Sequence, residues 1–166
     1  MKNKIILLLA FLFLLDGFIS ASNLEEWREN VLSNGYIYGI SNVTEIKDEI
    51  VFYADLPSNI NTSKRLIKTN YRRFEFGMMY DHKNSVLKNY NGSFLVRLIK
   101  ADNEEFSFIA NLGKDAVYLD GDDYEIFYFP ESFYGENVKV VITILVNDFP
   151  SYIDKVFFYL GFPRSK

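Results

Sequence analysis

Apolar and polar residues alternate along most of the chain, and this period of two is the pattern of strands that bury one face. The apolar members of the clearest repeats are Ile50, Phe52, Ala54 and Leu56; Phe74, Phe76, Met78 and Tyr80; Phe94, Val96 and Leu98; and Phe106, Phe108, Ala110 and Leu112. Turn-forming residues separate these repeats. The pattern predicts strands over residues 50–56, 74–80, 94–98 and 106–112.

Two further segments, residues 138–146 and 123–129, are apolar on both sides of the alternation. A strand of this kind is typical of the middle of a sheet that is covered on both faces, so we predict a central place for residues 138–146. Pro130 ends the other segment, because proline donates no ladder hydrogen bond. Residues 156–162 are better suited to a final strand than to a helix, because Val, Phe and Tyr favour strands.

The spacing of the turns gives about eight or nine short strands, which predicts an all-β fold. We expect an antiparallel β-sandwich of the immunoglobulin-like or jelly-roll type, with a closed β-barrel as the alternative. An open interior cavity would favour the barrel. A short helix over residues 23–32 is predicted from its Asn cap and from its apolar residues at three-four spacing, with Trp27 packing it against one end of the sandwich.

The first 22 residues have the pattern of an export signal. Lys2 and Lys4 precede an unbroken apolar run over residues 5–15, and small residues follow up to Ser22. We expect cleavage after Ser22, one β-sandwich domain over residues 23–166, and a secreted, periplasmic or cell-surface location with no stable membrane span after cleavage. An uncleaved anchor is the alternative, and Asp16 within the apolar segment counts against it.

Composition narrows the classes of partner and of chemistry. The net charge of −4 argues against a nucleic-acid binder, which normally presents a basic face to phosphates. The chain has no cysteine, so it forms no disulfides, and together with a single histidine, His82, this excludes the common zinc sites. A catalytic triad would need His82 as its base, and no G-x-S-x-G pattern supports one. We predict no catalytic residues.

A basic and aromatic group, Lys68, Tyr71, Arg72 and Arg73, is the candidate binding site. Its positive charge would suit an acidic partner or an anionic glycan, despite the acidic total. The alternative is an edge strand whose charges discourage aggregation between sheets.

Three carboxylates, Asp120, Asp122 and Asp123, are the candidate metal site, with calcium as the only cofactor considered. Their spacing does not fit an EF-hand loop, so another loop would have to complete the site. The alternative is a tight hairpin, because Asp-Gly at residues 120–121 suits positive backbone dihedral angles.

Taken together, the sequence predicts an exported, non-enzymatic binding or interaction module that recognises an extracellular protein or a glycan through loops or a sheet face. Alternatives are a small secreted hydrolase or carbohydrate-active protein, a lipocalin-like carrier of an apolar ligand, and a structural subunit of a surface assembly. Asn42, Asn61 and Asn91 begin glycosylation sequons, which matter only if the source glycosylates secreted proteins.

Overall fold

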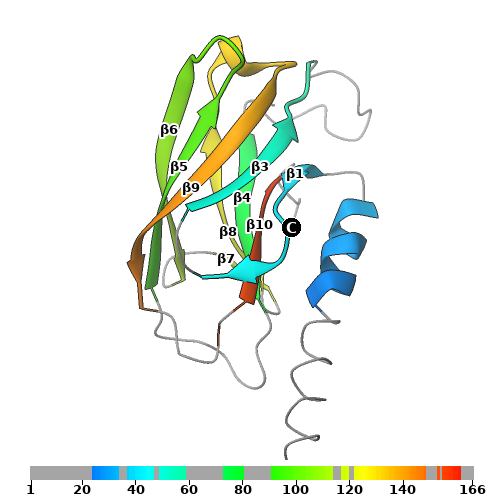
Figure 1. Ribbon diagram of the computed structural model, residues 1–166, viewed down its shortest axis with the longest axis vertical. Helices are drawn as coiled ribbons and strands as arrows, with labels where there is room; N and C mark the ends of the chain where they lie inside the picture. The colour runs from blue at the N-terminus through cyan, green and yellow to red at the C-terminus, as the bar shows by residue number, and fades with distance from the viewer. Residues whose placement is uncertain are drawn as a thin grey trace, which may run out of the picture.

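The computed structural model describes residues 24–33, 37–46, 49–58, 73–80, 91–113, 117–119, 122–148, 153 and 155–161 (Figure 1). Residues 24–33 are helical. The other elements of the described chain are β1 (Ile37–Ile40), β2 (Thr44–Glu45), β3 (Glu49–Asp55), β4 (Arg73–Tyr80), β5 (Asn91–Ile99), β6 (Glu105–Gly113), β7 (Val117–Leu119), β8 (Asp122–Tyr128), the 3-10 helix η1 (Glu131–Phe133), β9 (Asn137–Asn147) and β10 (Lys155–Gly161). The predicted export signal lies outside the described residues.

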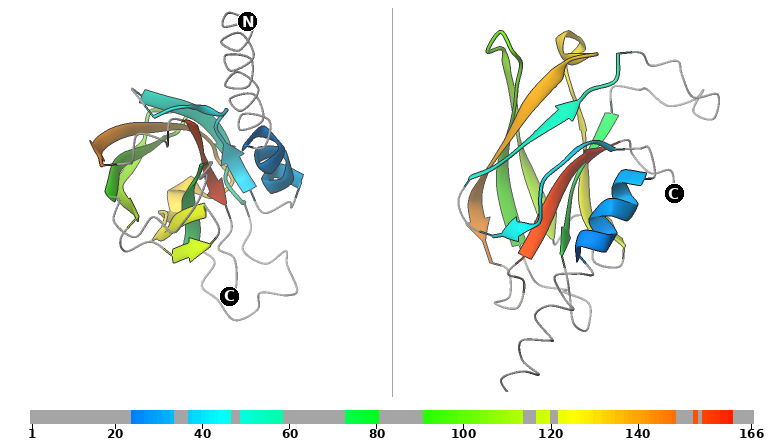
Figure 2. Two further views of the ribbon diagram at one scale, coloured as in Figure 1. Left: turned by 90° about the horizontal axis from the view of Figure 1, so that it is seen from below. Right: turned by 45° about the vertical axis from the view of Figure 1, so that its right-hand side comes forward.

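All strand pairs are antiparallel, and the strands form one sheet with the order β6-β5-β9-β3-β1-β10-β4-β8-β7, in which β2 pairs with β10. Seen end on, the sheet curls into a ring until β6 comes back towards β8 (Figure 2). The all-β prediction is therefore confirmed. The fold is intermediate between the predicted β-sandwich and the alternative β-barrel, because a single sheet wraps around one core and closes almost completely into a barrel-like shape.

Side chains rather than a backbone ladder close the sheet between β6 and β8, since no ladder between these two strands is formed by the described residues. The backbone N–H of Asn111 donates to Oε2 of Glu125 at 2.8 Å. The rings of Phe108 and Phe127 meet with centroids 4.1 Å apart. Between β6 and β8, aromatic packing thus holds together two strands that backbone hydrogen bonds would join elsewhere in the sheet.

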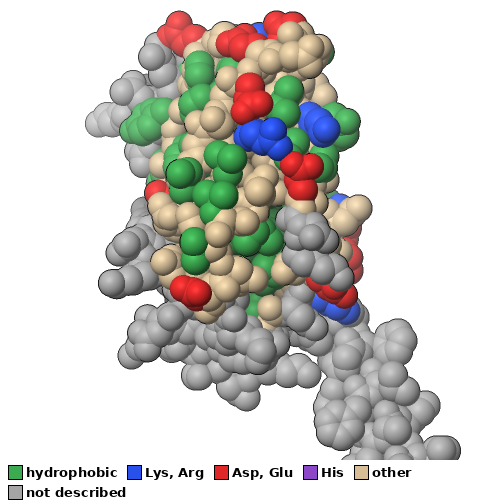
Figure 3. All heavy atoms as spheres, turned by 60° about the vertical axis from the view of Figure 1, so that its left-hand side comes forward, with side chains coloured by type: hydrophobic (Ala, Val, Ile, Leu, Met, Phe, Trp, Pro, Cys, Tyr) green, Lys and Arg blue, Asp and Glu red, His purple; other side chains and the backbone are tan. Residues whose placement is uncertain are grey.

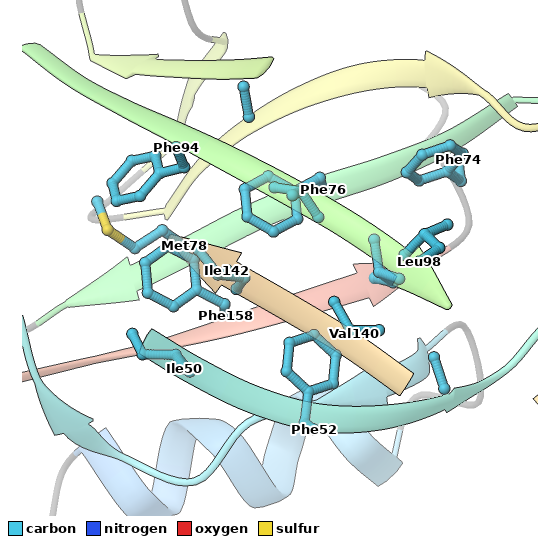
Figure 4. Packing of buried hydrophobic residues seen from close by; sticks show 14 of the residues in the cluster. Ile50, Phe52, Phe74, Phe76, Met78, Phe94, Leu98, Val140, Ile142 and Phe158 are labelled. Atoms are coloured by element: carbon cyan, nitrogen blue, oxygen red, sulfur yellow. The ribbon is translucent and has the colours of Figure 1, made fainter. Parts of the chain in front are cut away.

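The alternating apolar residues fill the interior of the curled sheet (Figure 4). Phe76 stacks on Phe158 with centroids 5.7 Å apart, and Phe94 meets Phe158 edge-on at 5.2 Å. Each large side chain buried in this way stabilises the fold by about 1.5–3 kcal/mol. The predicted inward sets are buried, except that Phe106 and Phe108 are only partly so.

The central strand β9 departs from the prediction at its end. Val138, Val140 and Ile142 are buried, but Leu145 and Val146 are 48% and 41% exposed. Residue 144 pairs with residue 94 and residue 146 pairs with residue 93, so a β-bulge adds one extra residue, Leu145. The bulge moves Val146 to the outer side of the sheet. The prediction that β9 is central is right, and the prediction that it is covered on both faces is wrong for this end.

The helix over residues 24–33 lies outside the sheet, beside β10 (Figures 1 and 2). Leu24 packs there with Phe157 and Tyr159, the outward-facing apolar residues of β10, and Trp27 packs against the same group. The predicted helix, its contact through Trp27 and the final strand are confirmed. The helix covers the outer face of β10, however, and not an end of the sandwich.

Arg28 fastens this helix to the sheet. Its Nε donates to the backbone oxygen of Ser41 at 2.8 Å. Ser41 is buried, and its Oγ accepts a hydrogen bond of 2.9 Å from the backbone N–H of Phe158 in β10. A charged side chain on the helix is therefore connected through one buried serine to the centre of the sheet.

Tyr159 lies across Gly77 in the neighbouring strand β4. A Cβ at Gly77 would collide with the tyrosine ring, so glycine at this position leaves room for the ring. The ring reaches over Gly77, and its hydroxyl donates to Oε1 of the buried Glu75 at 2.6 Å. This arrangement provides a buried carboxyl with a donor, which burial of such a group requires.

Candidate functional site

The predicted binding group cannot be assembled from the described residues. Lys68, Tyr71 and Arg72 lie outside them, as does His82, and only the backbone of Arg73 is described, as the first residue of β4 opposite Tyr128. The positive patch therefore stays a prediction.

The predicted calcium site is also untested. Asp122 and Asp123 begin β8 and pair with Met79 and Met78, but their side chains and Asp120 are not described. Since β7 ends at Leu119 and β8 begins at Asp122, only two residues connect them, as a tight hairpin requires. Within the described ranges, no group of three or more His, Asp or Glu side chains is placed to hold a metal ion.

The described structure instead presents an exposed apolar surface on the outer side of β6, β5, β9 and β3. We call it the outer apolar face; its exposed members are Ile109, Leu145, Val146, Val51 and Tyr53, and Leu95 and Ile99 are half-buried among them. The most exposed are Tyr53 at 63% and Ile109 at 53%. Figure 3 looks onto this side of the molecule, where apolar side chains gather with a few charged ones among them. Outward positions of a solvated strand are normally polar, so this group requires an explanation.

Strand register brings apolar residues of neighbouring strands together. Leu95 of β5 stands opposite Ile109 of β6, and Val51 of β3 stands opposite Val141 of β9. Directly opposed residues on one face of an antiparallel pair are close enough for their side chains to touch. Segments that are distant in sequence thus form one surface.

Arg97 of β5 crosses this face. Its Nη2 donates to Oε1 of Glu49 at 2.8 Å, and Glu49 belongs to β3, so the side chain passes over the intervening strand β9. Val141, the residue of β9 opposite Arg97, is only 2% exposed although it faces outward. We attribute this burial to the aliphatic stem of Arg97, which stands opposite Val141 and reaches across β9 to Glu49. The Nε of Arg97 is buried and has no hydrogen-bond partner in the described part of the chain.

Polar groups flank Tyr53 at one end of the face. Lys139 stands opposite it on β9, and Nδ2 of Asn137 donates to Oδ1 of Asp55 at 2.6 Å. An exposed ring with an amide, a carboxylate and an ammonium group beside it has the elements needed to stack on a partner and to fix its orientation.

A charged cluster closes the hairpin between β5 and β6. Nζ of Lys100 lies 2.6 Å from Oε2 of Glu104 and 3.4 Å from Oδ2 of Asp102, and Oγ of Ser132 donates to Glu104 at 2.8 Å. The bond to Glu104 raises the pKa of Lys100, and the bonds from Lys100 and Ser132 lower the pKa of Glu104. The backbone N–H of Glu104 lowers the pKa of Asp102. These contacts link the hairpin to η1, which is a structural role.

Comparisons with known proteins identify no family. No family model matches the chain, and no curated protein matches it. Among solved structures, it is similar to a Clostridium thermocellum endo-1,4-beta-D-xylanase 10B (CBM22-1 and GH10 modules complexed with xylohexaose), at 10% identity and a TM-score of 0.30 over 76% of this chain and 25% of that one. The chain thus spans about a quarter of that protein. A likeness this low carries neither fold nor function across.

No helix in the described part of the chain has both the length and the apolar character needed to cross a membrane.

Proposed function

We propose that the protein is an exported interaction module that binds a protein partner through the outer apolar face. The observation that carries this proposal is the exposure of large apolar side chains, from Ile109 on β6 to Tyr53 on β3, on the outer side of four neighbouring strands. Contiguous exposed apolar patches of this kind mark interaction sites in soluble proteins.

The residue types favour a protein over a sugar. Branched aliphatic side chains such as Val51 and Ile109 need a partner with apolar side chains of its own. Tyrosine and arginine, here Tyr53 and Arg97, are enriched among the residues that contribute most to protein interfaces. The hydrogen-bonded pair Asp55 and Asn137, beyond Tyr53 at one end of the face, provides part of the polar rim that such interfaces have.

A glycan is the second candidate, and one observation favours it. Tyr53 is 63% exposed and has the hydrogen-bonded pair Asp55 and Asn137 close by on the same face. An aromatic ring can stack on the apolar side of a sugar while neighbouring polar groups bind its hydroxyls. This candidate uses one end of the face, whereas a protein partner would use all of it.

Binding of the exported protein to extracellular proteins and to a glycan array tests the proposal, with Ile109→Lys as the site variant. Leu32→Lys is the matched control, because Leu32 is also an exposed apolar residue but lies on the helix beside β10. A saturable protein ligand that Ile109→Lys loses and Leu32→Lys keeps supports the proposal. Glycan binding that is lost in Tyr53→Ala and kept in Ile109→Lys would replace it with the second candidate.

A further inference from the structure

The curled sheet is closed along β8 in two different ways. At the start of β8, β7 forms a backbone ladder with it, in which Val117 pairs with Tyr124 and Leu119 with Asp122. Further along β8 the neighbouring strand is β6, and within the described residues no ladder joins these two strands. We call this second contact, between residues 106–111 of β6 and 125–127 of β8, the seam. Side chains alone therefore close the sheet along the seam.

Backbone groups of β6 point into the seam without a paired strand to receive them. The N–H of Asn111 points away from β5, to the side chain of Glu125. Because the direction of these groups repeats at every second residue of a strand, those of Ile109 and Ser107 point the same way. Neither residue forms a backbone hydrogen bond on that side with another described residue. Opening the seam would thus break the bond from Asn111 but no ladder.

The aromatic rings in the seam are incompletely buried. Phe108 and Phe127 meet with centroids 4.1 Å apart, and both remain partly exposed although they pack against the core. Ala110, the next inward residue of β6, is fully buried. Since partly exposed rings gain less from burial than core rings do, the seam is the weakest line of the closed sheet.

The two ends of β6 are held differently. One end continues into β7 after three residues, so the chain itself tethers it to the ladder with β8. At the other end, Oγ of Ser132 in η1 donates to Oε1 of Glu104 at 2.8 Å, which we call the latch. Beside the latch, the ring of Phe106 meets that of Phe133 edge-on at 6.0 Å. Side-chain contacts are all that hold this end of the seam closed among the described residues.

We propose that the sheet opens reversibly along the seam, with β6 remaining paired to β5 and with the latch opposing the opening. Nine residue pairs join β6 to β5, whereas one backbone N–H and a few side chains join it to β8. Opening therefore separates β6 from β8 and leaves the rest of the sheet intact. It gives solvent and small molecules a route to the interior that the ladders close elsewhere. This inference is independent of the outer apolar face.

Thiol labelling tests the inference, because the chain has no cysteine and a single introduced thiol reports on one position. Ala110→Cys places the thiol at the seam, and Val140→Cys, on β9 between two ladders, is the matched control; both residues are 0% exposed. Without denaturant, dithiobis(nitrobenzoic acid) should react about tenfold or more faster with Ala110→Cys. Low urea should hardly change that rate, because local opening exposes little surface, but should steeply raise the rate of Val140→Cys. Leu112→Cys, buried on the same strand, replaces Ala110→Cys if circular dichroism shows that the latter does not fold.

Three outcomes decide the inference. Adding Ser132→Ala to Ala110→Cys should raise the labelling rate about two- to tenfold, as loss of one hydrogen bond predicts, and an unchanged rate would mean that the latch does not oppose opening. Equal rates with the same urea dependence for the two thiols would overturn the proposal, since only global unfolding would then expose either. Hydrogen exchange of the Phe108 and Ala110 amides, which point towards β5, should stay slow. Exchange as fast as the labelling would show that β6 leaves β5 and would overturn the proposal as well.

Discussion

The outward apolar residues of two strands in the same sheet, β10 and β3, differ in their exposure to solvent. On β10, Phe157 and Tyr159 face outward and are 0% and 1% exposed, because the helix over residues 24–33 lies on them. On β3, Val51 and Tyr53 also face outward and are 44% and 63% exposed. Both strands are inner members of the sheet, so the difference does not come from strand position.

The comparison shows that the outward apolar residues of this sheet are shielded from solvent in different ways on different strands. At β10 the cover belongs to the chain itself, and Arg28 fastens it by its bond to Ser41. At β9 the cover is a single arginine stem over Val141. At β3 and β6 the described chain supplies none, which is why we assign the remaining cover to a partner.

Removing one ring from each region is the strongest way to test the comparison. Phe157→Ala should lower the free energy of unfolding by about 3–5 kcal/mol, because it leaves a cavity beneath the helix. Tyr53→Ala should change it by no more than about 0.5 kcal/mol at monomer concentrations, because the ring is already in solvent. Urea unfolding at low protein concentration measures both values.

The same pair shows how the comparison would fail. If Tyr53→Ala destabilises the monomer as much as Phe157→Ala does, the outer apolar face is covered within the chain, and there is no free surface for a partner. A cost for Tyr53→Ala that grows with protein concentration would instead reflect linkage to association through this face.

A smaller change in the free energy of unfolding is expected at Val141, which is covered only by the stem of Arg97. Arg97→Ala should cost about 1 kcal/mol, because it uncovers Val141 and removes an ion pair that is itself worth about 0.2–1 kcal/mol when half-exposed. Glu49→Gln is the matched control, since it removes the charge of the pair but keeps the stem over Val141. Equal losses in the two variants, measured by urea unfolding, would show that the ion pair and not the covering of Val141 is responsible.

Much of the fold could be predicted from local pattern. Alternation identified β3, β4, β5 and β6, and the preference of Val, Phe and Tyr for strands placed β10 correctly against a helical alternative. The bulge at Leu145 was missed because it depends on how β9 pairs with β5 over the region of residues 93–94. The side of the sheet that the helix covers was missed for a similar reason, since it depends on the outward residues of a strand more than 100 residues away.

The outer apolar face was not predicted, although its residues are plain in the sequence. Val51 and Tyr53 stand on the side of their strand opposite to the core residues, which on its own is ordinary for a single strand. What makes them a surface is that Ile109 and Leu95 lie on the same side of neighbouring strands, and only register shows this. A usable signal is an apolar residue at outward positions of several predicted strands in one chain.

The smallest effect is expected at the ammonium group of Lys100, which lies 5.6 Å from the ring centre of the buried Phe133 and is held by Glu104. Because the folded state lowers the pKa of Glu104, the stabilisation that this carboxylate provides is present above its unfolded pKa of about 4.3 and is lost as the pH falls through its folded pKa. Glu104→Gln should therefore reduce the urea midpoint slightly at neutral pH and leave it unchanged at acid pH below the folded pKa. Glu105→Gln, at the exposed neighbouring residue, is the control. If the urea midpoint of Glu104→Gln falls at acid pH as much as that of the wild type does, the ion pair between Lys100 and Glu104 does not stabilise the contact of the hairpin with Phe133. The charged hairpin would then not act as a cover, unlike the helix and the arginine stem.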